Sequence, residues 1–194
     1  FFFFFIDSRW KFNTKGEKVV SGDTVMVHHF VVIGDVLTNC PYTCGYLVGK
    51  FSNLDQMGNP GSHPGKVFPD TDFPMIRLAD VYLMLGESSL QNGDAGTALN
   101  YINLVRERAY GNSNFNLSNV SLQDFLDERS RELYWECTRR TDLVRHNKFT
   151  TSDLLWSFKG GDPNGTSVED FRNLYPLPTY DIVNNPNLTQ NSGY

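Results

Sequence analysis

Glu128-Arg-Ser-Arg-Glu-Leu-Tyr-Trp-Glu-Cys-Thr-Arg-Arg-Thr-Asp-Leu-Val-Arg-His146 is the stretch that decides the fold. We expect it to lie in one long helix that begins behind Ser121, a residue type suited to an N-cap, with Asp124 as the capping-box partner. Apolar side chains recur at three- and four-residue spacings, which predicts one buried helix face. They are Leu122, Phe125, Leu126, Leu133, Cys137 and Val144.

Charged residues fill the rest of this predicted helix, with opposite charges three or four positions apart. The pairs are Glu128 with Arg131, Arg129 with Glu132, Glu136 with Arg140, and Arg139 with Asp142. Such residues are neighbours on a helix surface, and each exposed pair contributes only roughly 0.2–0.5 kcal/mol. We therefore predict a mainly structural role, in which Arg139 and Asp142 hold loops and the C-terminal tail through charge-assisted hydrogen bonds.

Composition narrows the class of protein. The 194 residues carry a net charge of −5, with 20% charged and 14% aromatic residues, and no run of Lys and Arg exceeds two residues. A nucleic-acid-binding protein would show a basic patch, so we exclude a nucleic-acid partner. The length suits one domain or part of a larger one.

Two amphipathic segments before the charged stretch predict a helical hairpin. The first is Phe73–Leu90, with Pro74 in the first turn, where a missing N–H has no consequence. After a short turn, Asp94 caps a second helix, Ala95–Ala109, which ends at Gly111. The expected apolar sets are Ile76, Ala79, Val81, Leu83 and Leu90 in the first helix, and Ala98, Tyr101, Ile102 and Val105 in the second.

This hairpin resembles a single tetratricopeptide-like unit, through Leu85-Gly86, Gly93-Asp94, Ala98 and Tyr101. Such hairpins normally occur in arrays, because one unit cannot bury its own apolar face. Only one unit is visible, so we expect companion helices upstream of the given sequence.

The flanking segments read as strands, loops and turns. We expect strands at Val25–Ile33 and Tyr46–Phe51, an extended segment at Asn173–Pro178 and a short helix at Thr179–Val183. The fold class is therefore mainly α: a tetratricopeptide-like helical hairpin plus a long charged helix, with strand- and loop-rich flanks. We assign 1–70 to a strand- and loop-rich segment, 71–150 to a helical segment and 151–194 to a loop-rich tail, all in one domain.

Motifs for catalysis, metals and cofactors are missing from the sequence. The stretches Gly45–Lys50 and Gly61–Lys66 are each one residue short of a phosphate-binding loop. Glu128, Glu132 and Glu136 have no Glu-x-x-His partner, so a di-metal carboxylate site is not expected. We predict no enzymatic activity, no cofactor and no metal site.

The cysteines and the N-terminus bear on compartment. A disulfide between Cys40 and Cys44 is possible in an oxidising compartment, but cysteine usage leaves the compartment open. No apolar run approaches the roughly 20 residues of a transmembrane helix. Five consecutive Phe residues at positions 1–5 are an aggregation hazard at a free terminus, so we expect the natural chain to begin upstream.

The charged stretch also resembles the signature helix of the SusD/RagB family, with the pattern Glu-Arg-x-x-Glu-Leu-x-x-Glu-x-x-Arg-x-x-Asp-Leu. The matching positions are Glu128, Arg129, Glu132, Leu133, Glu136, Arg139, Asp142 and Leu143. Cys137 stands where the family usually has glycine, Thr141 where it has an aromatic residue, and His146 where tryptophan is common.

Three further segments resemble the family in its own order. They are the helical pair with Arg77–Leu83 and Ala98–Arg108, the Tyr-Pro-x-Pro segment at 175–178, and the tail at 185–194 of the form Asn-Pro-x-Leu-x-Gln-Asn-x-Gly-Tyr. The four matches span roughly residues 74–194. By this resemblance the chain is the C-terminal portion of a SusD-like protein.

The resemblance implies a non-catalytic surface lipoprotein that captures nutrients, most often glycans of the starch or oligosaccharide type. The implied partners are an oligosaccharide or peptide ligand and a SusC-like TonB-dependent transporter. The implied location is the extracellular face of the outer membrane, through an N-terminal lipid anchor that this chain lacks. An alternative is a tetratricopeptide-like adaptor that binds a protein helix or tail in a groove.

Sugar capture needs aromatic faces beside polar groups. The candidate aromatics are Trp10, Tyr42, Tyr46 and Trp156, and core packing is the default role for each. Trp10, in a polar context near the N-terminal end, is the one residue that we predict to bind ligand.

Overall fold

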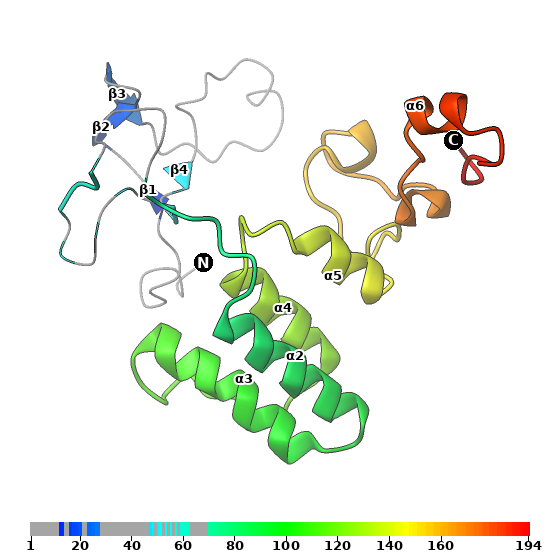
Figure 1. Ribbon diagram of the computed structural model, residues 1–194. Coiled ribbons are helices and arrows are strands. Elements are labelled where there is room, and N and C mark those ends of the chain that lie inside the picture. The colour runs from blue at the N-terminus through cyan, green and yellow to red at the C-terminus, as the bar shows by residue number, and fades with distance from the viewer. Residues whose placement is uncertain are drawn as a thin grey trace. The chain divides into compact units, whose positions relative to one another are not determined.

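The computed structural model describes residues 70–194 throughout, positions 50, 51, 53, 55, 57 and 59–62, and the backbone of four short strands. The described chain is mainly α-helical (Figure 1), as the sequence predicts. It forms two compact units, Phe1–Arg139 and Arg140–Tyr194.

The four strands form two separate antiparallel pairs. Strand β1 (Phe12–Asn13) pairs with β4 (Leu47–Val48), and β2 (Gly16–Val20) pairs with β3 (Asp23–Val27). Residues 25–27 of the first predicted strand lie in β3, and 28–33 lie outside the described residues. The second predicted strand is shorter than expected, because Lys50 and Phe51 lie in a bend.

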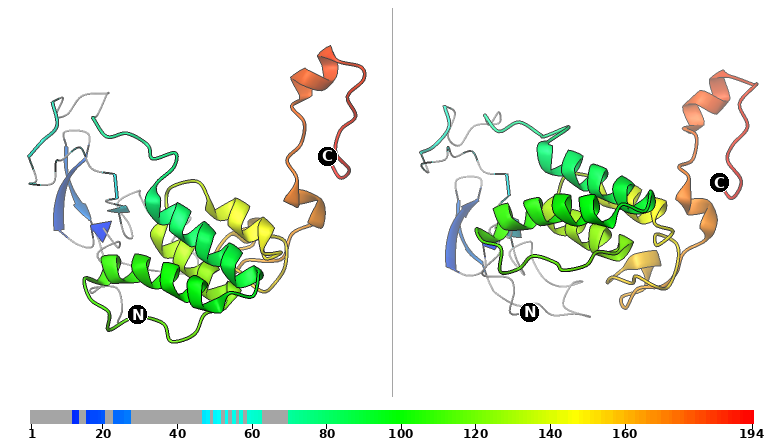
Figure 2. Two further views of the ribbon diagram at one scale, coloured as in Figure 1. Left: turned by 60° about the horizontal axis from the view of Figure 1, so that its bottom comes forward. Right: turned by 90° about the horizontal axis from the view of Figure 1, so that it is seen from below.

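The predicted helical hairpin is present as α2 (Leu78–Gln91) and α3 (Ala95–Tyr110). The Asp94 side chain accepts a hydrogen bond from the Thr97 backbone N–H at 3.0 Å, and Gly111 ends α3 in the left-handed conformation. Figure 2 shows α2, α3 and α4 (Leu122–Glu132) lying side by side.

The start of the first helix was wrongly predicted. Helix α2 begins at Leu78 instead of Phe73, because Arg77 has an extended backbone and its guanidinium binds the carboxylates of Glu132 and Glu136. Ile76, expected in the core, is 79% exposed.

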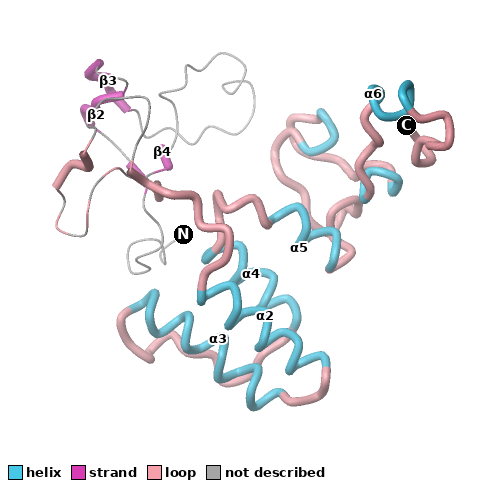
Figure 3. The backbone as a smooth tube through the Cα atoms, in the orientation of Figure 1, coloured by secondary structure: helices cyan, strands magenta, loops and turns pink. Residues whose placement is uncertain are grey.

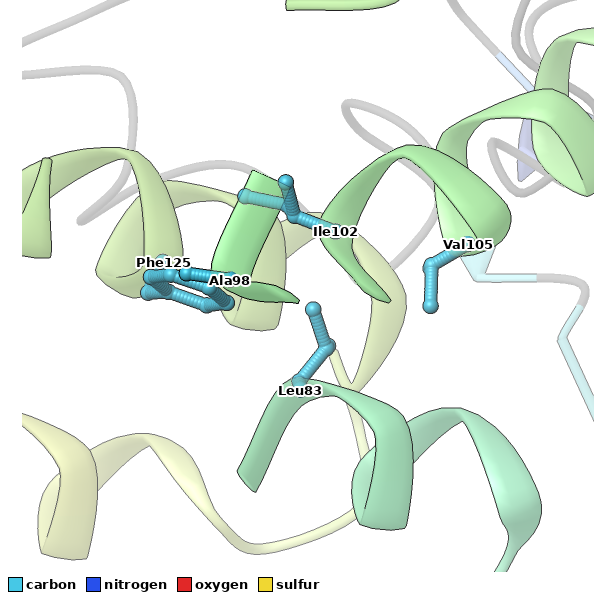
Figure 4. Close-up of a cluster of buried hydrophobic side chains, with 5 residues drawn as sticks. All are labelled: Leu83, Ala98, Ile102, Val105 and Phe125. Atoms are coloured by element: carbon cyan, nitrogen blue, oxygen red, sulfur yellow. The ribbon is translucent and has the colours of Figure 1, made fainter. Parts of the chain in front are cut away.

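The core of the first unit lies where α2 contacts α3 and α4. One cluster of buried apolar side chains there consists of Leu83, Ala98, Ile102, Val105 and Phe125. Figure 4 shows Leu83 of α2 pointing toward α3, and Phe125 entering the cluster from α4. Gly86 allows this approach, since a Cβ atom at that position would lie 2.8 Å from the Phe125 ring. The third helix thus buries the apolar face that a lone hairpin would expose.

The single long helix was also wrongly predicted. Helix α4 ends at Glu132, and α5 (Arg139–Arg145) begins only after a turn in which Trp135 and Cys137 have φ angles of 62° and 60°. Those angles do not fit a right-handed helix. The predicted N-terminus is confirmed, because Ser121 and Asp124 form a complete capping box.

Two side chains from distant parts of the chain stabilise this break. The backbone carbonyl of Glu132 accepts hydrogen bonds from Lys50 Nζ at 3.0 Å and from Arg77 Nη2 at 2.6 Å. Lys50 Nζ also donates to the carbonyl of Tyr134 at 2.9 Å. These donors satisfy carbonyl groups that lack partners at a helix C-terminus. Leu133 is buried as predicted, whereas Leu122 and Cys137 are exposed.

We expect Cys137→Gly to raise the free energy of unfolding. Cys137 is exposed and has a φ angle of 60°. Relief of the left-handed conformation outweighs the added chain entropy of glycine by about 0.5–1 kcal/mol. Urea denaturation of the two proteins measures the difference. Cys137→Ala is the matched control, because it removes the thiol and keeps the strain, so an equal gain in both variants would contradict the prediction.

The second unit consists of short helices joined by loops (Figure 3). They include η2 (Lys159–Gly161), η3 (Asp170–Asn173) and α6 (Thr179–Asn184), and α6 confirms the predicted short helix. Among the described helices, none has both the length and the apolar character needed to cross a membrane.

The C-terminal tail binds the Tyr-Pro-Leu-Pro segment that precedes α6. Gln190 exchanges two hydrogen bonds with the backbone of Leu177, at 2.8 and 2.9 Å. Asn191 Nδ2 donates to the carbonyl of Tyr175 at 2.7 Å, and the Tyr194 hydroxyl donates to the carbonyl of Leu174 at 2.9 Å. Two motifs recognised separately in the sequence therefore form one structure.

Candidate ligand-binding site

Of the four candidate aromatic residues, the structure describes only Trp156. Trp10, the predicted ligand-binding residue, lies outside the described residues, as do Tyr42 and Tyr46. Trp156 was assigned to the core by default, but 43% of its surface is exposed, so it is not a core residue.

The charged stretch forms buried ion pairs with distant residues, and not only the local pairs that the spacing predicts. Glu128 is fully buried, and its carboxylate pairs with Arg106 at 2.7 Å and with Arg131 at 2.8 Å. Glu132 pairs with Arg77 and Arg108, both at 2.5 Å. Within the described part of the chain, no group of three or more His, Cys, Asp or Glu side chains could hold a metal ion.

Glu136 lies at the centre of a second set of charges. It binds Arg77 at 2.8 Å and also pairs with Lys50, so its expected partner Arg140 is replaced. Burial by itself would raise the pKa of Glu136, but hydrogen bonds from Arg77 and Lys50 lower it below the ordinary value. Burial lowers the pKa of Lys50, and the contact with Glu136 opposes this only in part.

Arg140 performs the role predicted for its neighbour Arg139. Its Nη2 donates to the carbonyl of Arg172 at 2.7 Å, and its guanidinium lies 3.8 Å from the centroid of the Tyr175 ring. Arg140 thus holds the segment that carries the tail, while Arg139 donates to the carbonyl of Leu126 at 2.9 Å.

A pocket of about 540 Å³ opens in the second unit, within the size range of small-molecule sites. Three of the residues that line it are aromatic: Phe149, Trp156 and Phe158. The remaining lining residues are Lys159, Gly160, Ser167, Val168, Glu169 and Arg172. We take this pocket, here called the Trp156 pocket, as the candidate ligand-binding site.

Lys159 fixes the loop that forms the pocket. Its side chain is buried, and Nζ donates to the carbonyls of Thr151 and Leu154 at 2.6 and 2.7 Å. Nζ also lies 4.8 Å from the centroid of the Trp156 ring. Burial lowers the pKa of Lys159, and the negative charge of Asp153 opposes this. Lys159 therefore bonds to the segment that precedes Trp156 and also contacts the Trp156 ring.

Two residues of the pocket loop, Phe158 and Gly165, have backbone conformations that favour glycine. Gly165 has a φ angle of 82°, and a Cβ atom there would lie 2.4 Å from the Trp156 carbonyl oxygen. Phe158 has a φ angle of 66°, which is rare for a bulky residue, and its side chain is 40% exposed. Strained backbone of this kind concentrates at functional sites.

Three polar residues line the pocket together with the aromatic rings. Ser167, Glu169 and Arg172 are all exposed residues. Among the residues that the structure describes, none forms a hydrogen bond through these three side chains. The pocket therefore offers a hydroxyl, a carboxylate and a guanidinium beside apolar rings.

The structure thus combines a helical hairpin, α2 and α3, with a pocket formed by the loops of the second unit. The chain belongs to the SusD family, whose profile matches residues 35–194. It is 44% identical over 153 residues to the starch-binding protein SusD of Bacteroides thetaiotaomicron, covering 79% of this chain and 27% of that protein. It is 34% identical over 168 residues to SusD-like protein P25 of Formosa agariphila, covering 80% of this chain and 29% of that protein.

The fold also matches solved structures. The surface glycan-binding protein A of Bacteroides uniformis superposes with a TM-score of 0.64 at 22% identity, covering 96% of this chain and 38% of that one. The chain spans less than a third of the length of the two relatives named above, SusD and SusD-like protein P25. The family resemblance drawn from the charged stretch and the tail is confirmed.

Proposed function

We propose that the chain is the C-terminal part of one SusD-like domain in a surface protein that captures glycans. The observation that supports this proposal is the match to the SusD family over residues 35–194, together with 44% identity to a starch-binding relative. The protein acts by binding alone, with starch-type oligosaccharides as the first ligand class to test and a peptide as the second.

In this proposal a SusC-like TonB-dependent transporter receives the captured ligand. A lipid anchor at the N-terminus of the full-length protein holds it on the extracellular face of the outer membrane. Trp10 contacts the ligand, since an indole can cover the apolar face of a pyranose ring.

The test uses the full-length protein from its native membrane fraction. We expect detergent to be required for release, the intact mass to include acyl groups, and a TonB-dependent transporter to co-purify. Calorimetric titration with maltoheptaose is expected to give saturable binding, weakened about tenfold, or about 1.4 kcal/mol, by Trp10→Ala. A soluble, unacylated protein that binds peptide tails and does not bind glycans would instead support the alternative function, a tetratricopeptide-like adaptor for other proteins.

A further inference from the structure

We propose that the Trp156 pocket is a binding subsite for a neutral pyranose ring of an oligosaccharide. This inference rests on the proposed glycan-binding function and assigns part of that function to the second unit. All lining residues lie between Phe149 and Arg172, so the pocket belongs to that unit alone.

The apolar side of the argument comes from the aromatic rings. Trp156 and Phe158 both line the pocket, and 43% and 40% of their surface is exposed. A pyranose ring has an apolar face of C–H groups that covers an aromatic ring well, and such contact removes apolar surface from water. The left-handed backbone conformation of Phe158 costs free energy, and the Phe158 ring nevertheless remains exposed.

Hydrogen-bonding capacity supplies the polar side of the argument. Ser167 offers a hydroxyl, Glu169 two acceptor oxygens, and Arg172 five N–H donors. Sugar hydroxyl groups both donate and accept, so they can bind each of these groups at once. An alkyl chain or a lipid tail would make no hydrogen bond with these groups, so the pocket suits such a ligand less well.

Charge favours a neutral sugar over an anionic one. Glu169 and Arg172, which both line the pocket, carry opposite charges. The ammonium group of Lys159 is turned to the carbonyls of Thr151 and Leu154, which use two of its three donors. The pocket therefore lacks the concentrated positive charge with which proteins recognise carboxylates or phosphates.

The experiment follows Trp156 by ¹⁹F NMR in full-length protein labelled with 5-fluorotryptophan. The Trp156 resonance is assigned by its loss in Trp156→Phe, and maltoheptaose is the probe. We expect the Trp156 resonance to shift saturably. Trp135 is the matched control, since it is 65% exposed and lies in the first unit. Its resonance should not move.

Variants then separate this subsite from the rest of the protein. Trp156→Ala and Ser167→Ala are expected to weaken maltoheptaose binding about tenfold and severalfold, respectively, while Trp135→Ala leaves it unchanged. Ser167→Ala removes one exposed hydroxyl, so it tests the pocket even where Trp156→Ala disturbs the loop.

The outcomes are distinct for the two proposals. A wild-type protein that binds maltoheptaose, with a Trp156 resonance that stays fixed and variants that bind normally, overturns the subsite and leaves glycan capture intact. Tighter binding of an acidic oligosaccharide than of maltoheptaose overturns the assignment to a neutral sugar. A wild-type protein that binds neither maltoheptaose nor the acidic oligosaccharide overturns both the subsite and the glycan-capture proposal.

Discussion

Replacing Glu128 with alanine is expected to lower the free energy of unfolding by about 3–5 kcal/mol. The Glu128 side chain is fully buried and accepts hydrogen bonds from both Arg106 and Arg131. Its removal leaves the Arg106 guanidinium, only 11% exposed, facing a protein interior without its counter-charge. The cost is therefore mainly that of an uncompensated buried charge, since the ion pair itself has a small net value.

Urea denaturation monitored by circular dichroism measures this change. Asp127→Ala is the matched control on the same helix, where the carboxylate accepts a hydrogen bond from Gln123 four residues earlier. We expect that control to lie within about 0.5 kcal/mol of the wild-type protein. Equal losses in the two variants would mean that the buried charge of Glu128 does not determine the result.

The sequence predicts the hairpin because its signals are local. Asp94 bonds to a backbone group three residues away, and Gly111 takes a backbone conformation that glycine adopts easily. The Ser121 capping box is equally local. Each of these features can be recognised within one turn of chain, so the helix ends that they determine were placed correctly.

The break in the charged stretch could not be predicted, because its causes are distant in sequence. Lys50 and Arg77 reach the carbonyl of Glu132 across 82 and 55 residues. The apolar period continues across the break, with Leu133 and Leu143 both buried, so periodicity alone indicates one helix. Spacing of charges likewise suggested local pairs, whereas Glu136 pairs with Lys50 and Arg77.

The candidate site was missed for a related reason. Trp156 was among the four aromatic candidates, but Ser167, Glu169 and Arg172, which line the pocket with it, come from the loop and the η3 helix that follow 11 to 16 residues later. The turn-rich composition of 151–170 and the repeated glycines were visible signals. What they could not show is that Gly165 lies against the Trp156 backbone and that Lys159 bonds to two carbonyls.

Replacing Phe125 with alanine is expected to lower the free energy of unfolding by about 3–5 kcal/mol. Phe125 is fully buried and joins α4 to the hairpin, so its loss leaves a cavity among α2, α3 and α4. Gly86→Ala is expected to cost about 1–3 kcal/mol in the wild-type protein, because the new Cβ would lie 2.8 Å from the Phe125 ring.

The two changes should not be additive. Once the Phe125 ring is absent, the methyl group of an alanine at position 86 occupies part of the cavity and also favours the helix. The double variant is therefore expected to be at least as stable as Phe125→Ala alone, with a coupling free energy of about 1–3 kcal/mol. Gly96→Ala is the matched control, since the new Cβ there meets only Asp94 Oδ1 at 3.6 Å, and it should be neutral or stabilising in both backgrounds. Additive losses from Gly86→Ala and Phe125→Ala would show that Gly86 does not set the distance between α2 and α4.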